Sequence, residues 1–390
     1  MDAQLAQSQI RLGVSGKLNT RVMEWFLTKN RSWESLEKEF QWVADMSGVM
    51  QDARHHAEGD VAVHTRMVIK SLVSLEQFKA LDVQSQEILW TSALMHDIEK
   101  RSTTSIEDDG SITSRGHAKK GEYAVRDILF RDVPTPFFLR EKICALVRHH
   151  GLPLWIFEKS KPVRTLYETA LRIDMPLLAM LAKADVLGRI CQDQRELLDR
   201  VELFEAFCQE QQCWSSPRSF ASDLARFVYF RKEESSADYD PYDDLKGEVT
   251  MLSGLPGMGK DRYINRHCAN LPMISLDDIR RKHKVKPDDP SATGWVVQEA
   301  KEQAKVYLRK GEPFVWNATN ITKQMRSQWI DLFVSYKARV NLIYIEVPYK
   351  DWLKQNGNRE HPVPINVMQR MLGKLEVPTL DEAHHVDYVV

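Results

Sequence analysis

The sequence predicts two domains, a helical N-terminal domain followed by an α/β domain with a parallel sheet. Its 390 residues exceed what one hydrophobic core usually holds. Up to about residue 230, apolar residues recur at helical spacing, as in Leu177, Leu178, Leu181 and Ala182, without convincing strand alternation. Beyond that point, short β-rich runs alternate with helical stretches, which is typical of a parallel sheet covered by helices.

Residues 231–247 are predicted to link the two domains. They are polar and acidic and show no apolar periodicity. The helical domain is therefore expected over residues 1–230, although its first 45 residues carry no specific feature beyond helical packing. The α/β domain is expected over residues 248–390, with β-rich runs at 248–253, 314–316 and 340–347.

The composition indicates a cytoplasmic protein that does not enter a membrane. The apolar fraction of 43% is enough for a sizeable core, and no apolar run reaches the ~18–20 residues of a bilayer span. The N-terminus lacks the features of a signal peptide, and the five cysteines form no CxxC pair. Since the net charge is only −1, a nucleic acid would have to be held by local basic patches such as residues 280–286.

A phosphate-binding loop is predicted at the start of the α/β domain. Residues 254–260, GLPGMGK, follow a predicted strand and precede a predicted helix, the context that distinguishes a P-loop from a glycine-rich turn with a stray lysine. Backbone N–H groups would bind the phosphates, Lys260 would reach the β- and γ-phosphates, and the ligand would be ATP or another nucleoside triphosphate with Mg²⁺. Asp261 stands where Ser or Thr usually ligates Mg²⁺. The predicted nucleotide-binding residues are Gly254, Pro256, Gly257, Met258, Gly259, Lys260 and Asp261.

Residues 277–280 are candidates for binding the phosphate acceptor. Asp277 follows a strand-like run, so its carboxylate can deprotonate an attacking hydroxyl near the γ-phosphate. Arg280 can hold another phosphate of the acceptor. Alternatively, Asp277 and Asp278 only cap the following helix.

These elements together resemble the 5′-OH polynucleotide kinase family. The resemblance is carried by the P-loop, the Asp-Asp-x-Arg element at 277–280, Thr319-Asn320 after a strand, and a basic lid segment at 358–371. It implies that Asp277 is the general base and that Arg280 binds the acceptor phosphate. It also implies that the lid arginines Arg359 and Arg370 clamp the donor phosphates; the alternative is that they are solvated surface charges. The family often has an aspartate where this chain has Asn317.

The helical domain contains a candidate metal site. His64, His96, Asp97, His150 and Asp185 continue the apolar faces of their helices and are therefore expected to point inward. A buried carboxylate needs a partner, and a divalent metal serves several such groups at once. The alternative is a helical core with coincidental histidines. Periodicity favours His150 over His149, and the full set of candidate ligands is His64, His96, Asp97, His117, His149, His150 and Asp185.

The order of these residues resembles the HD phosphohydrolase superfamily. The resemblance implies a first metal held by His64, His96, Asp97 and Asp185. It implies a second site that contains His117 and either His149 or His150, with Asp97 as the shared catalytic ligand. One or two divalent transition metals would then activate water and neutralise phosphoryl charge. Lys100 and Arg101 follow the His-Asp pair and can steady a substrate phosphate; the alternative is that they are surface charges.

Together, the two modules resemble a bacterial family of end-healing enzymes in which an HD phosphohydrolase is fused to a polynucleotide kinase. The implied substrates are RNA or DNA ends that carry a 5′-OH and a 2′,3′-cyclic, 2′- or 3′-phosphate, and a separate RNA ligase would seal the healed ends. Two alternatives remain open. One is a nucleoside or small-molecule kinase fused to a nucleotidase, and the other is a regulatory ATP-binding switch with a nucleotide-sensing HD domain.

Overall fold

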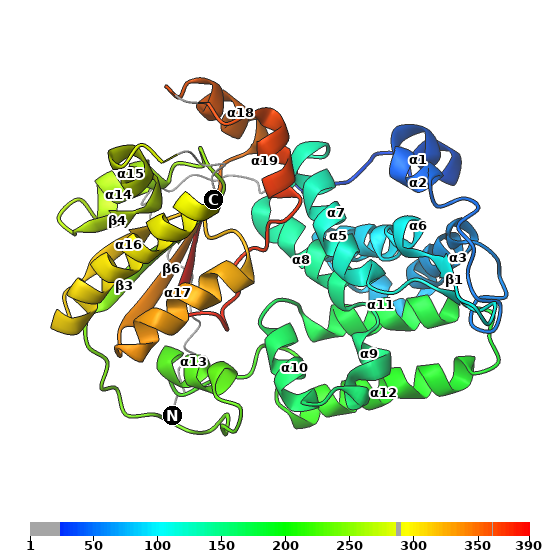
Figure 1. The fold of residues 1–390 in the computed structure, drawn as a ribbon. Coiled ribbons are helices and arrows are strands. Elements are labelled where there is room, and N and C mark those ends of the chain that lie inside the picture. The colour runs from blue at the N-terminus through cyan, green and yellow to red at the C-terminus, as the bar shows by residue number, and fades with distance from the viewer. Residues whose placement is uncertain (1–23, 286–289, 361) are drawn as a thin grey trace.

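A computed structural model describes residues 24–285, 290–360 and 362–390. The start of the predicted helical domain (1–23), Lys286 of the basic run and His361 of the lid segment lie outside the described residues. Figure 1 shows a helical half and an α/β half that pack side by side, so the predicted fold class is confirmed. No helix among the described residues is both long and apolar enough to cross a membrane.

From residue 24 onward, where the structure describes it, the helical half contains thirteen α-helices, one 3-10 turn and a small antiparallel hairpin. The helices are α1 (Trp33–Glu39), α2 (Gln41–Ala44), α3 (Val61–Ser74), α4 (Glu76–Lys79), α5 (Val83–Met95), α6 (Lys100–Thr103), α7 (His117–Arg131), α8 (Phe137–His149), α9 (Leu152–Trp155), α10 (Pro162–Ala170), α11 (Met175–Leu187), α12 (Gln194–Glu210) and α13 (Asp223–Arg231). The 3-10 turn is η1 (Ile156–Glu158), and the hairpin is β1 (Ser105–Ile106) with β2 (Ile112–Thr113).

Two helices lie at the centre of the helical half. Nine consecutive residues of α5, 87–95, are buried, and α11 is buried on nearly all sides. A helix with apolar residues all round can only lie inside a protein. Both helices pack against α3 and α8. Polar residues at the C-terminal ends of α5 and α11 consequently lie in the interior.

The α/β half is built on a parallel five-stranded sheet with strand order β4-β5-β3-β6-β7. The strands are β3 (Glu248–Ser253), β4 (Met273–Ser275), β5 (Phe314–Asn317), β6 (Arg339–Ile345) and β7 (His385–Val389). The helices are α14 (Lys260–His267), α15 (Leu276–Lys282), α16 (Pro290–Lys310), α17 (Lys323–Ser335), α18 (Tyr349–Gly357) and α19 (Ile365–Leu372). The connection after β3 leads to β4 on one side of the sheet, whereas the connection after the neighbouring strand β6 leads to β7 on the other side. The loop after β3 therefore lies at the switch point where ligands of such sheets bind.

Helix α13 and the segment after it join the two halves. Phe227 of α13 belongs to the core of the α/β half, where its ring lies 4.0 Å from that of His384, whereas Tyr229 belongs to the helical core. In the acidic segment that follows, Asp243 and Asp244 form ion pairs with Arg339 and Lys337. The chain therefore stays attached to the α/β half along this connection.

A mixed apolar and ionic interface holds the halves together. Phe130 and Phe137 of the helical half pack in one cluster with Leu255, Met258 and Trp352 of the α/β half. The guanidinium of Arg140, on α8, donates two hydrogen bonds of 2.9 Å to Glu346, just after β6. Both side chains are buried, so each charge depends on the other.

We expect Arg140→Ala to lower the free energy of unfolding by about 3–5 kcal/mol, because Glu346 would be left as an uncompensated buried charge. Chemical denaturation followed by circular dichroism measures the loss. Arg131→Ala is the matched control, because Arg131 forms only partly exposed pairs with Asp127 and Asp132 and should change stability by about 1 kcal/mol or less. Equal stability of the two variants would contradict a structural role for the buried pair.

Candidate active sites

Four central helices and the start of α7 bring the predicted metal ligands together. His64 lies in α3 and Asp185 in α11, while His96 and Asp97 directly follow α5. His150 ends α8, and His117 is the first residue of α7. All except His117 are at least 95% buried, as the helical periodicity predicts.

The ligand atoms form two groups that meet at Asp97. The first group contains His64, His96 and Asp185, with His64 Nε2 3.1 Å and His96 Nε2 4.0 Å from Asp185 Oδ1. The second contains Asp97, His117 and His150, and Asp97 Oδ1 lies 3.3 Å from His117 Nε2 and 3.8 Å from His150 Nε2. The other oxygen, Asp97 Oδ2, lies 3.2 Å from His96 Nε2. Asp97 thus faces both groups, one oxygen toward each.

The hydrogen bonds of the rings test whether these residues fit a metal. In His96, His117 and His150, Nδ1 lies 2.7–2.8 Å from a backbone carbonyl oxygen. A carbonyl only accepts, so Nδ1 carries the proton and Nε2 presents its lone pair to the site. The lone pairs of His117 and His150 face each other at 3.3 Å, an arrangement that a cation stabilises.

Two buried atoms of the site complete the test. Neither His96 Nε2 nor Asp97 Oδ1 has a hydrogen-bond partner among the described residues, and such buried atoms are rare without an ion or water. The residues present therefore fit one or two divalent metal ions. When bound, such ions lower the pKa of water and neutralise charge on a phosphoryl group.

Three of the candidate ligands, Asp97, Asp185 and His150, are in their metal-binding forms at neutral pH. Burial by itself raises the pKa of Asp97, but His96 and Lys100 hold that pKa well below its ordinary value. Burial likewise opposes ionisation of Asp185, yet Arg189 and His64 keep its pKa well below the ordinary value. Burial, together with the other histidines, lowers the pKa of His150 to about 3. The carboxylates are consequently ionised and His150 is neutral, which are the ligand forms.

The structure does not support His149 as a ligand. Its Nε2 lies 3.4 Å from Arg172 Nη1, and the residue belongs to neither group. Consecutive helical residues point about 100° apart, so only one member of the His149-His150 pair can face the site. Lys100 and Arg101, which come shortly after the His96-Asp97 pair, also point in different directions. Lys100 contacts Asp97 at 2.8 Å, whereas Arg101 turns to Asp45 and Glu99.

Two supporting residues, Glu58 and Arg189, are missing from the sequence prediction. Glu58 Oε1 lies 2.8 Å from Nδ1 of both His56 and His64, and so orients the His64 ring. Glu58 precedes α3 in a turn, where helical periodicity carries no information. Arg189 donates to both oxygens of Asp185 from four residues further on. That i,i+4 spacing is a signal from which Arg189 could have been found.

The loop after β3 has the geometry of a phosphate cradle. Gly254 has φ +145°, and a Cβ there would lie 2.4 Å from the carbonyl oxygen of Ile345, so only glycine fits. Lys260 begins α14, and its ammonium donates to the carbonyl oxygens of Gly254 and Leu255 at 2.8 and 2.9 Å. Arg359 lies against the loop at Gly257. Arg370 is exposed on α19, and the described contacts do not link it to the loop.

Asp261 and Asn317, the two residues that differ from the expected P-loop kinase pattern, contact each other. Asn317, at the end of β5, donates from Nδ2 to Asp261 Oδ1 at 2.9 Å. The amide thereby orients the carboxylate that stands in the usual Ser or Thr position. Carboxylate oxygens are ligands that Mg²⁺ prefers, so Asp261 fits a role in holding the ion and Asn317 a role in positioning Asp261.

Of the candidate acceptor residues, Asp277 lies in the first turn of α15, two residues beyond the end of β4, and Arg280 lies in the last turn. Ser275 caps this helix by accepting from the backbone N–H of Asp278, so neither aspartate is needed as the cap. Asp277 Oδ1 instead accepts from Arg280 Nη1 at 3.0 Å. The Asp277 side chain is 66% exposed, so its carboxylate is accessible to a substrate.

Comparison with known families agrees with both domains. A family model described as an HD domain matches residues 61–187, and one described as an AAA domain matches residues 249–378. The chain joins an HD domain to a P-loop domain. Together with the site geometry, these matches support a metal-dependent phosphohydrolase fused to a kinase-like domain. No curated protein matches the chain.

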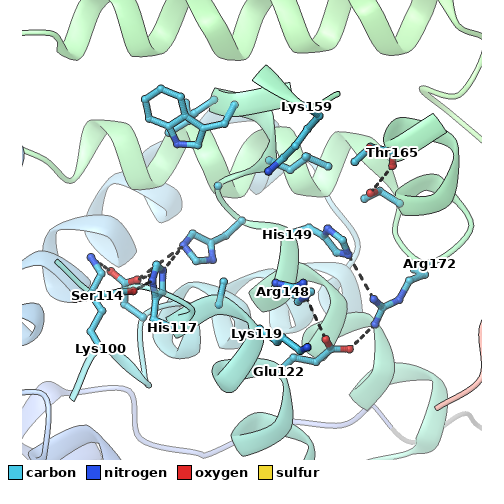
Figure 2. A pocket seen from close by; sticks show the side chains of 18 of the residues that line it. Lys100, Ser114, His117, Lys119, Glu122, Arg148, His149, Lys159, Thr165 and Arg172 are labelled. Carbon is cyan, nitrogen blue, oxygen red and sulfur yellow. Dashed lines mark hydrogen bonds and ion pairs between the residues drawn. The ribbon is translucent and has the colours of Figure 1, made fainter. Parts of the chain in front are cut away.

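Both domains line the cavity in front of the metal ligands. The cavity has a volume of about 850 Å³ and contains Asp97, His117 and His150 in its wall. Its residues from the P-loop domain include Lys323 and Glu376. Figure 2 shows His117 and Lys100 in one part of this cavity and His149, Arg148 and Arg172 in another. The HD site is therefore completed by the packing of the second domain.

We expect His96→Ala to lower metal affinity by more than the roughly 10–100-fold that follows loss of an outer-shell partner, because His96 supplies a donor atom. Elemental analysis of the purified protein measures the metal bound per chain. The neighbouring histidine provides the control, because His149→Ala should retain the metal. Loss of metal from the His149 variant alone would show that the ligand assignment is wrong.

The P-loop lysine should make nucleotide binding depend on pH. Burial lowers the pKa of Lys260 to about 8, against the opposing effects of Asp261 and Asp277. Lys260 therefore loses its charge as the pH rises through about 8, and we expect the Kd for ATP to increase between about pH 7 and pH 9. Calorimetric titration at several pH values measures this change. Lys260→Arg should remove the dependence, because arginine stays charged; an unchanged dependence in that variant would exclude Lys260 as its source.

Proposed function

We propose that the chain heals broken polynucleotide ends, with the P-loop domain phosphorylating a 5′-OH and the HD domain removing a terminal 2′,3′-cyclic, 2′- or 3′-phosphate. The observation that carries the proposal is the Asp277–Arg280 pair in α15, the helix that follows β4. This pair lies at the same end of the parallel sheet as Lys260, which begins the helix that follows the loop after β3. A carboxylate and a guanidinium side by side suit an acceptor that offers a hydroxyl and a phosphate. A polynucleotide 5′ end has both groups, whereas a free nucleoside has only the hydroxyl.

In the kinase reaction, Asp277 takes the proton of the 5′-hydroxyl as its oxygen attacks the γ-phosphorus of ATP. The bond between the γ-phosphorus and the bridging oxygen breaks, and ADP leaves. Lys260 and Arg359, which lie at the loop, stabilise the charge on the donor phosphates. Arg280 binds the phosphate that follows the 5′ nucleoside.

In the HD domain, the terminal phosphate would face the two ligand groups and Lys100. Attack of water on the phosphorus opens the 2′,3′-cyclic ester by breaking one P–O bond, which leaves a monoester. A second hydrolysis releases inorganic phosphate and restores the hydroxyl. The Lys100 ammonium, 2.8 Å from Asp97, is placed to contact a phosphate oxygen.

The two activities complement each other at a single break. A ligase needs a 5′-phosphate and a 3′-hydroxyl, and each domain would produce one of them. A separate RNA ligase would then complete the repair. All five cysteines are free, which suits work in the reducing cytoplasm.

One observation favours a second candidate, a nucleoside kinase fused to a nucleotidase. The net charge of −1 provides no general attraction for a polynucleotide. In that case Arg280 would be unnecessary for the kinase reaction.

A single assay separates the two candidates. An RNA oligonucleotide with a 5′-OH and a 2′,3′-cyclic phosphate is incubated with γ-labelled ATP, alongside free nucleosides. We expect label at the RNA 5′ end and loss of the terminal phosphate at the other end. Label on nucleosides and never on RNA would overturn the repair proposal.

Variants should separate the two activities. Asp277→Ala is expected to reduce RNA labelling by about 10²–10⁴-fold, the usual contribution of a general base, and to spare phosphate release. Asp97→Ala should have the reverse effect. Asp278→Ala is the matched control, because Asp278 pairs with Arg281 and should preserve both activities. If folded Asp97→Ala also lost kinase activity, the assignment of two independent sites would be wrong.

A further inference from the structure

The HD cavity extends past the metal ligands to a second set of cations. Lys119 of α7, Arg148 of α8, Lys159 beyond η1 and Arg172 beyond α10 all line it. In Figure 2, these residues lie beyond His117 and Lys100, with Lys159 across the cavity from Lys119 and Arg148. None of the four belongs to either ligand group, and neither domain's proposed chemistry uses them.

The carboxylates near Arg148 and Arg172 neutralise the positive charge of these two arginines only in part. Glu122 accepts from Arg172 at 2.6 Å and lies 3.6 Å from Arg148. The same carboxylate also accepts from Arg126 at 3.0 Å. Although Arg126 has a second partner in Glu141, that carboxylate also pairs with Arg140. The Arg148 and Arg172 guanidinium groups consequently retain donors and positive charge for a ligand.

The two lysines add unpaired charge from opposite walls. Neither Lys119 nor Lys159 lies within ion-pair distance of a carboxylate in the part of the chain that the structure describes, and both are exposed to the cavity. By contrast, Lys323 on the P-loop side is neutralised by Glu168 and Asp381. The excess positive charge therefore concentrates around Lys119, Lys159, Arg148 and Arg172.

An aromatic ring also lines the cavity. Trp155 lines the cavity and is 39% exposed. Its indole packs next to Gly151, which directly follows His150, since a Cβ on that glycine would lie 3.8 Å from Trp155 Cδ1. The Arg200 guanidinium lies 4.6 Å from the centroid of this ring and covers one face, so the other face is left for stacking a base of a single strand.

We propose that Lys119, Arg148, Lys159 and Arg172 bind the phosphodiester that precedes the terminal phosphate, so the HD site selects a strand end over a mononucleotide. This inference rests on the proposed function and specifies its substrate class. His149 and His150 are adjacent at the end of α8 but point to different parts of the cavity. His150 faces the ligand groups, and His149 faces Arg172. A terminal phosphate at the two ligand groups would therefore leave the preceding phosphodiester of the strand near His149 and Arg172.

The test compares two substrates that differ by one nucleotide and therefore by one phosphodiester. One is a nucleoside 2′,3′-cyclic monophosphate, and the other is a dinucleotide that ends in the same cyclic phosphate. The wild-type protein should have a lower KM for the dinucleotide. The double variant Lys119→Ala/Lys159→Ala should raise that KM roughly tenfold or more, the value of lost bonds to a charged group, and leave kcat and the mononucleotide KM unchanged.

Lys70→Ala is the matched control, because Lys70 is exposed on α3, outside the cavity, and should change neither KM. Higher salt should weaken binding of the dinucleotide more than that of the mononucleotide. Equal KM values for the two substrates in the wild-type protein, or an equal change for both in the double variant, would overturn the second phosphate site alone. Failure of the wild-type protein to hydrolyse either substrate would instead overturn the proposed function of the HD domain.

Discussion

The buried carboxylate of Asp97 is the constraint on which the HD domain depends. An ionised carboxylate is costly to bury, and this one follows a helix whose last nine residues, 87–95, are all buried. His96 and Lys100 offset part of the cost, yet one oxygen has no hydrogen-bond partner among the described residues. A cation beside this oxygen of Asp97 would offset the rest of the cost of burying the charge. The helical core, the orientation of the histidine rings and the proposed chemistry all follow from the need to accommodate this charge.

The packing of the domains has a functional consequence as well as an energetic one. The buried Arg140–Glu346 pair and the shared aromatic cluster hold the P-loop domain against the helices. In this position, Lys323 and Glu376 of the P-loop domain form part of the wall of the HD cavity. The HD domain alone would have a more open site. The two activities therefore share structure even though each has its own reacting groups.

Much of both sites could be predicted because regular elements repeat at known intervals. Helical periodicity placed His64, His96, Asp97, His150 and Asp185 in the interior, and the strand–loop–helix context identified the P-loop. Periodicity could not choose firmly between His149 and His150 at a helix end. It also carried no information about Glu58, which reaches the site from a turn. The contact between Asp261 and Asn317 joins residues from separate elements, so it was visible in the sequence only as two separate departures.

The sequence alone therefore determined the two-domain architecture, the phosphate-binding loop and the types of residue that could bind metal. These properties depend on local spacing along single helices and strands, which the order of residues records directly. Only the tertiary structure decided that Asp97 faces two ligand groups and that Asn317 orients Asp261. It also decided that four cations gather beyond the metal ligands in a cavity walled by both domains. Those relations join residues far apart in the chain, and they arise only when the helices and the sheet pack together.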